Sequence, residues 1–424
     1  MLEIRDRGLT VSKGFWALLD QGLFAGSNFV LSLLLARWVT LQEYGAFAIA
    51  FTIFLLLSTL HTALLTEPMM VLGSRKYCDR LPTYLTILLY GHVGISGIGA
   101  LLIFTIGIVV RLYGSRSLSS SLFGIAVAGL LILFLWLMRR ACYVLLKPHL
   151  AAFGGGLYTI LMLGGVYALV WMAWLTVSSA FIVMGLASLI VGLLLARRLH
   201  LSLLIPAKSE LPAQILKEHW AYGRWAIATN VLGWVPGHVY YLFLPFWGGL
   251  EASAALKILD NLLQPVAHSL LALSYLLLPT FARIRSQNHF GSFLRSSLTL
   301  LCSIAILNWM IVGLFNYQIV TWLYGGRYGD YAHLLWLMGL APVIASIIIV
   351  SARALCALER PDLVFWANVP STVITLTVGL SLMITWGIFG VCIAGLLSLL
   401  ASAAVMTWLL YSKVLFKQRV VATA

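Results

Sequence analysis

The sequence predicts an all-α, polytopic integral membrane protein of about twelve transmembrane helices, arranged as two related six-helix lobes. Two observations predict this fold class: an apolar composition divided into blocks of membrane-spanning length, and an internal sequence repeat. Of the 424 residues, 62% are hydrophobic and only 9% are charged, whereas soluble domains carry about 25% charged residues. The mean hydropathy of +1.00 is typical of lipid-embedded chains.

The apolar blocks give the positions of the helices, because about 20 apolar residues cross a bilayer as one helix. We expect spans at 14–36, 46–70, 84–110, 120–138, 152–173, 177–196, 222–245, 252–280, 294–318, 333–352, 364–386 and 388–411. The first block contains Asp20 and Gln21, and we interpret it as a retained span because it is too long and too polar for a signal-peptide core.

The basic residues give the orientation. The formal net charge is +14, but Lys and Arg occur in short clusters between apolar blocks, which indicates loops facing an anionic leaflet rather than nucleic-acid binding. All but five of the 27 Lys and Arg residues fall on one side of the predicted topology. That side is predicted to be cytoplasmic, so we expect a multi-pass protein of the bacterial inner (cytoplasmic) membrane with both termini in the cytoplasm.

The internal repeat gives the domain organisation. Arg140-Ala141, followed by Lys147-Pro148, recurs 213 residues later as Arg353-Ala354, followed by Arg360-Pro361. Each half has an even number of spans, so both halves insert the same way up and are related by a pseudo-two-fold axis along the membrane normal. We divide the chain into an N-terminal lobe (1–205), a cytoplasmic inter-lobe linker (206–221) and a C-terminal lobe (222–424).

Motifs for soluble enzyme chemistry are absent from the sequence. It contains no Walker A, HExxH or GxSxG pattern, and its five cysteines form no CxxC pair. We therefore expect no enzymatic activity, no cofactor and no metal site. An integral-membrane polysaccharide polymerase or ligase would be similarly hydrophobic, but it would need an extended periplasmic segment, and the longest polar loop here is predicted to be cytoplasmic.

Short motifs resemble those of a known family. Leu35-Ala36-Arg37 and Glu43-Tyr44-Gly45 are similar to the junction after the first span of polysaccharide transporters and O-antigen flippases. These belong to the multidrug/oligosaccharidyl-lipid/polysaccharide (MOP) superfamily, which includes multidrug and toxin extrusion transporters and the lipid II flippase. The resemblance covers essentially the whole chain, although Glu251-Ala252-Ser253 in the second half lacks the glycine of Glu43-Tyr44-Gly45.

The resemblance implies a central cavity between the lobes, alternating access, and movement of an isoprenoid-linked oligosaccharide to the periplasmic leaflet. The product would serve envelope or extracellular polysaccharide synthesis, such as lipopolysaccharide or exopolysaccharide. The expected partners are this lipid-linked substrate, membrane lipids and other polysaccharide-assembly membrane proteins, but no nucleic acid. An ion-coupled multidrug exporter of the same superfamily is an alternative, and it predicts a cavity dominated by carboxylates.

A polar stripe in the eighth span is the strongest candidate for a substrate site. At 100° per residue, its members share one helix face about 100° wide; they are Lys257, Asp260, Asn261, Gln264 and His268. Charges are costly in lipid, so the stripe is expected to line a cavity, where Lys257 would meet a phosphate or an acidic sugar. Alternatively, Lys257 and Asp260 neutralise each other and hold two helices together.

Two carboxylates are candidates for ion coupling. Asp20 lies in the first span, and the alternative is a carboxylate near the interface that is solvated from the cytoplasm. Glu67 precedes Pro68, which should free a backbone carbonyl and kink its helix; capping or snorkelling is the alternative role for Glu67.

Three arginines are candidates for gating or guidance of a pyrophosphate head group, because Arg binds such groups in bidentate fashion; they are Arg37, Arg140 and Arg353. Interfacial anchoring is the alternative for all three.

Overall fold

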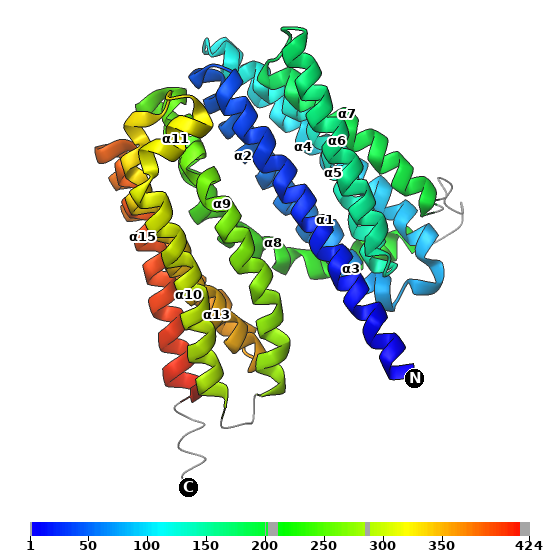
Figure 1. Cartoon of the computed structure of the whole chain (residues 1–424). Helices are drawn as coiled ribbons and strands as arrows, with labels where there is room; N and C mark the ends of the chain where they lie inside the picture. The colour runs from blue at the N-terminus through cyan, green and yellow to red at the C-terminus, as the bar shows by residue number, and fades with distance from the viewer. Residues whose placement is uncertain (1, 200, 202–210, 285–288, 416–424) are drawn as a thin grey trace. The chain divides into compact units, whose positions relative to one another are not determined.

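The structure is a computed structural model that describes residues 2–199, 201, 211–284 and 289–415 (Figure 1). In these ranges the regular elements are all helices, and no strand occurs. The chain divides into two units, Met1–Val231 and Leu232–Ala424, and the division falls inside the helix α8.

The first unit is built around the helix α5. Its helices are α1 (Leu2–Trp38), α2 (Leu41–His61), α3 (Glu67–Arg75), α4 (Leu81–Leu112), α5 (Arg116–Val144), α6 (Pro148–Trp171), α7 (Val177–Arg198) and the first part of α8 (Leu211–Phe243). Helix α5 packs against α2, α4 and α7, and α1 packs against α6. Helix α5 is therefore buried over most of its length.

Glycines bring α5 and α7 close together. A Cβ at Gly124 would lie 2.9 Å from the Ser178 Cα, and a Cβ at Gly185 would lie 3.0 Å from the Ala128 Cα. Helices in lipid associate largely through close packing of small residues, since burial of apolar side chains gains little there. This contact fixes α5, which carries the arginines of the first candidate site at its C-terminal end.

A π-helical turn at Thr62–Thr66 interrupts the second membrane-spanning segment between α2 and α3. Pro68 has no N–H to bond the Leu64 carbonyl four residues earlier, and that carbonyl lies 2.8 Å from His219 Nδ1 on α8. Because a carbonyl only accepts, Nδ1 carries the ring proton, and Nε2 accepts from the Tyr84 hydroxyl at 2.7 Å. The prediction that Pro68 frees a backbone carbonyl is confirmed.

The second unit contains the remainder of α8 and the later helices. These are α9 (Pro245–Arg283), α10 (Phe290–Leu314), α11 (Asn316–Tyr324), α12 (Leu335–Met338), α13 (Ala341–Ala357), α14 (Pro361–Ile374) and α15 (Leu380–Leu409). Fully buried side chains of α9, α10, α13 and α15 form its core, among them Phe281, Leu301, Val350 and Met406.

The lengths and compositions of the helices are those of a multi-pass membrane protein. Within the described ranges, ten helical stretches are long and apolar enough to cross a bilayer. One of them, Pro361–Ser412, has 52 residues, or about 78 Å of helix, against a hydrocarbon core of about 30 Å. It turns at Gly387, whose φ is 57°, and so supplies two spans. With these two, the described ranges contain eleven such stretches, against about twelve predicted, and the all-helical fold class is confirmed.

Several predicted boundaries differ from the structure. Helix α5 continues to Val144, past the predicted end of its span at 138, so Arg139 and Arg140 lie within the helix and not in a loop. Arg353 likewise lies inside α13. Of the predicted linker, residues 206–210 lie outside the described residues and 211–221 belong to α8; the predicted lobe boundaries stay a prediction.

Candidate functional site

A buried ion pair joins α1 to α5 in the first unit. Asp20 of α1 is fully buried, and its Oδ1 accepts hydrogen bonds from Arg139 Nη2 at 2.8 Å and Nε at 3.1 Å. Its Oδ2 accepts from the Tyr143 hydroxyl at 2.6 Å. Arg139 and Tyr143 are four residues apart on α5, so both side chains reach the same carboxylate. The alternative of a solvated carboxylate at Asp20 is therefore wrong.

The arginine of this pair is enclosed as well. Its side chain is 8% exposed, and the guanidinium carbon lies 4.1 Å from the centre of the Phe24 ring, a cation–π contact. Removal of one partner of such a buried pair costs about 3–5 kcal/mol, because the other charge is left uncompensated. The Asp20–Arg139 pair therefore ties α1 to α5.

A cavity of about 190 Å³ opens beside the pair. We call it the N-terminal pocket; besides Asp20, Arg139 and Tyr143 it is lined by Gln21, Phe24, Thr62, Thr66, Trp136 and Arg140. The two threonines come from the π-turn, which therefore forms one wall. Arg140 is exposed, and no ion pair involves it within the described part of the chain.

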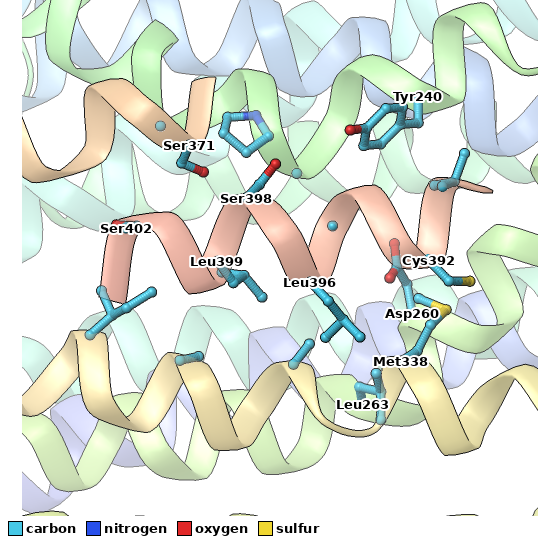
Figure 2. A pocket seen from close by; sticks show the side chains of 18 of the residues that line it. Tyr240, Asp260, Leu263, Met338, Ser371, Cys392, Leu396, Ser398, Leu399 and Ser402 are labelled. Atoms are coloured by element: carbon cyan, nitrogen blue, oxygen red, sulfur yellow. The ribbon is translucent and has the colours of Figure 1, made fainter. Parts of the chain in front are cut away.

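A larger cavity of about 420 Å³ lies in the second unit (Figure 2). We call it the C-terminal cavity. Its walls are mostly apolar residues of α8, α9, α13 and α15, and its polar lining includes Asp260, Asn368, Ser371, Ser398 and Ser402. Figure 2 shows Asp260 beside Cys392 and Met338 at one end, with Ser398 and Ser402 farther along α15. Such a lining offers hydroxyl and amide groups on an apolar surface, which suits a ligand with both kinds of surface.

Comparison with solved structures identifies the fold. The lipid II flippase MurJ, in an inward closed conformation, is 14% identical with a TM-score of 0.75 over 95% of this chain and 87% of that chain. An inward-facing multidrug resistance MATE family transporter of the MOP superfamily is 13% identical with a TM-score of 0.74, over 92% and 93% of the two chains. The MATE multidrug transporter DinF-BH is 18% identical with a TM-score of 0.68 over 95% of each chain.

The chain has the fold of MOP-superfamily transporters. At these identities the likeness establishes the fold, and the proteins that share it are transporters and flippases rather than enzymes. No protein-family model and no curated protein sequence matches the chain.

Of the predicted stripe on α9, one member belongs to the lining of the C-terminal cavity. Asp260 lines the C-terminal cavity, and its Oδ2 accepts a hydrogen bond from the Tyr241 hydroxyl of α8. Lys257 attracts Asp260 electrostatically, and its Nζ lies 5.9 Å from the centre of the Tyr241 ring. The neighbouring Asn261 is buried, Gln264 is half-buried and His268 is exposed. A substrate role for these residues stays a prediction.

The remaining predicted residues are dispersed. Glu67 opens α3 and is half-buried, and its Oε1 accepts from Asn230 Nδ2 at 3.1 Å. Arg37 is exposed in the last turn of α1. Arg353 Nη2 lies 3.3 Å from Ser274 Oγ. Of the predicted coupling and guidance residues, the structure brings together only Asp20 and Arg140, in the N-terminal pocket.

The sequence reasoning missed the residues that bind the carboxylates of Asp20 and Asp260. These are Arg139 and Tyr143 for Asp20, and Tyr241 for Asp260. The sequence did contain a signal for a partner of Asp20. Arg139 and Arg140 are adjacent, so in a helix they point about 100° apart, and only one can face outward. A carboxylate buried in another helix requires a cation, so one of these two arginines could be expected to pair with Asp20.

Proposed function

We propose that the chain is a flippase, which moves an isoprenoid-linked oligosaccharide from the cytoplasmic to the periplasmic leaflet of the bacterial inner membrane for polysaccharide synthesis. Both termini would face the cytoplasm, and transport would proceed by alternating access. Asp20, Asp260 and Glu67 are the candidates for coupling to an ion gradient. The fold is compatible with this activity, since a lipid II flippase shares it.

One observation carries the choice of substrate: the carboxylates that line the two cavities are already compensated. Asp20 is paired with Arg139 and bonded by Tyr143. Asp260 is bonded by Tyr241 and attracted by Lys257. A cavity that selects cationic drugs is expected to present carboxylates without such partners, since an opposite charge must attract the ligand. The N-terminal pocket, to which Arg140 adds a further cation, instead suits an anionic group.

A multidrug exporter is the second candidate, and the C-terminal cavity favours it. Its volume of about 420 Å³ falls within the range of about 300–1,000 Å³ typical of sites for drug-sized molecules, and most of its lining is apolar. Two of the solved structures with this fold are multidrug transporters.

A deletion strain separates these functions. Surface polysaccharide, lipid-linked repeat units and drug susceptibility are measured side by side. A flippase predicts lost polysaccharide and repeat units that accumulate facing the cytoplasm. Repeat units that accumulate facing the periplasm would indicate a polymerase or ligase, and unchanged polysaccharide with new drug sensitivity would indicate the exporter.

A further inference from the structure

We propose that His219 is a proton-operated latch, which holds the first turns of α8 on the π-turn at Thr62–Thr66 while its ring is neutral and releases them when the ring takes up a proton. The residues of the latch all lie in the first unit. The chain passes from the first unit to the second within α8, so the latch acts on the helix that leads from one to the other. It does not depend on the identity of the transported substrate.

The ring of His219 joins three segments of the first unit. It is buried, its Nδ1–H donates to the Leu64 carbonyl of the π-turn at 2.8 Å, and its Nε2 accepts from the Tyr84 hydroxyl of α4 at 2.7 Å. This pair of bonds requires a neutral ring that carries its proton on Nδ1. The Leu64 carbonyl is the one that Pro68 leaves free, so α8 supplies the hydrogen bond that the second span lacks.

Close packing continues one turn farther along α8. A Cβ at Gly223 would lie 3.0 Å from the Ala63 carbonyl oxygen and 3.3 Å from the Leu64 Cα. Two successive turns of α8 therefore lie directly against the π-turn. Single π-turns inside helices are frequent at functional sites, and this one is held from the side by a helix that its own chain segment does not contain.

Protonation of the ring opposes docking. With a proton on Nε2, the Tyr84 hydroxyl can no longer donate to that atom, and the imidazolium is buried away from water, which disfavours its charge. His219 precedes the predicted span 222–245. Burial lowers the pKa of His219 below its ordinary value, although the bond to the Leu64 carbonyl and the charge of Glu218 oppose this effect. The docked form therefore excludes the proton that a released, hydrated ring accepts.

The charged groups around the latch do not compensate an imidazolium well. Glu218 is the neighbouring carboxylate on α8, but its Oε1 is bound by Lys76 Nζ at 2.5 Å and its Oε2 by the Tyr77 hydroxyl at 3.0 Å. Helix α4 contributes Tyr84, and the π-turn itself contains no ionisable side chain. Because Lys76 already neutralises Glu218, that carboxylate is a weak counter-ion for a charged His219.

The direction of the pH dependence follows from these states. A histidine whose pKa is lowered by docking contributes its stabilisation above its ordinary pKa of about 6.5 and loses it as the pH falls below that value. For uptake of one proton, the ratio of released to docked α8 should rise about tenfold between pH 7.5 and pH 5.5.

Hydrogen exchange measures this ratio. The purified full-length protein in phosphatidylcholine nanodiscs is exchanged at pH 7.5 and pH 5.5, and rates for peptides covering 62–68 and 211–223 are divided by those of the unstructured peptides. Protection in the wild type should fall about tenfold at the lower pH. His219→Gln can donate and accept but does not titrate in this range, so its protection should be the same at both pH values. His219→Asn, whose amide nitrogen is closer to the Nδ1 position, gives the same test if His219→Gln does not fold.

Two variants separate titration from a merely structural role. Tyr84→Phe removes the donor to Nε2 and should lower protection at both pH values while keeping the tenfold ratio. His149→Gln replaces an exposed histidine of α6 and should behave as the wild type. Matching elution profiles and thermal midpoints at pH 7.5 establish that each variant folds.

The rival source of a pH effect is a buried histidine pair next to the π-turn. His61 Nε2 lies 3.1 Å from His92 Nδ1. A pH dependence that persists in both His219 variants but disappears in His92→Gln would assign the titration to that pair and overturn the latch. Equal protection of the wild type at pH 7.5 and pH 5.5 would overturn it as well. Neither result bears on whether the deletion strain loses polysaccharide, so the latch and the flippase function fail independently.

Discussion

Replacement of Arg139 by leucine should destabilise the first unit more than any single change at the surface. The substitution leaves the Asp20 carboxylate fully buried, with only the Tyr143 hydroxyl as partner. A buried charge that loses its counter-ion costs about 3–5 kcal/mol. For domains of 150–250 residues, 1 kcal/mol corresponds to about 2–4 °C, so the thermal midpoint of the purified protein should fall by roughly 6–20 °C.

The double variant tests whether the cost arises from the unpaired charge. Asp20→Asn combined with Arg139→Leu removes both charges, and we expect it to recover part of the lost midpoint, which is a coupling between the two sites. Arg140 lies one residue along α5 but is exposed and forms no ion pair with a described residue. Arg140→Leu should therefore change the free energy of unfolding by about 0.5 kcal/mol or less. If Arg139→Leu is no worse than Arg140→Leu, or if the double variant loses the full sum of the single losses, the pair does not hold α1 to α5.

Three further substitutions test local features by the same thermal measurement. Tyr143→Phe removes the hydroxyl donor to Asp20 and should cost about 1.5–3 kcal/mol; an unchanged midpoint would contradict that bond. Gly223→Ala places a Cβ 3.0 Å from the Ala63 carbonyl oxygen and should lower the thermal midpoint. Gly233→Ala is the control and should not lower it, because nothing lies near that Cβ. Equal midpoints for the two variants would refute close docking of α8 on the π-turn. Gly387→Ala forces a positive φ of 57° on an L-residue and should cost about 1–2 kcal/mol, and no loss would argue against the turn.

Much of the fold could be predicted from the sequence because its signals are local. Each apolar block is long enough to span a bilayer, and each is mostly helical in the structure, although turns at Phe315 and at 339–340 divide the blocks 294–318 and 333–352. The Pro68 signal worked for the same reason, since proline frees the carbonyl of a residue four positions earlier. Hydropathy predicts that the span ends near 138, but α5 continues to Val144. The helix extends past the apolar block because its polar residues there, such as Arg139, have hydrogen-bonding partners on other helices.

The candidate site was harder to predict because its contacts join distant segments. Asp20 and Arg139 are 119 residues apart, and Asp260 is bonded by a tyrosine of the preceding helix. Helical periodicity placed the α9 stripe on one face, but it gives no information on which neighbouring helix covers which part of that face. Asn261 is therefore buried while His268 is exposed, although both belong to the same predicted stripe.

Reconstitution tests the central claim most directly. The purified protein is placed in liposomes that contain a fluorescent isoprenoid-linked oligosaccharide, and a membrane-impermeant quencher reports how much label changes leaflet. We predict translocation well above that of protein-free liposomes. Export of a cationic dye in the same vesicles would establish that the protein is active. If that active protein moves the labelled lipid no faster than protein-free liposomes do, the flippase function is contradicted.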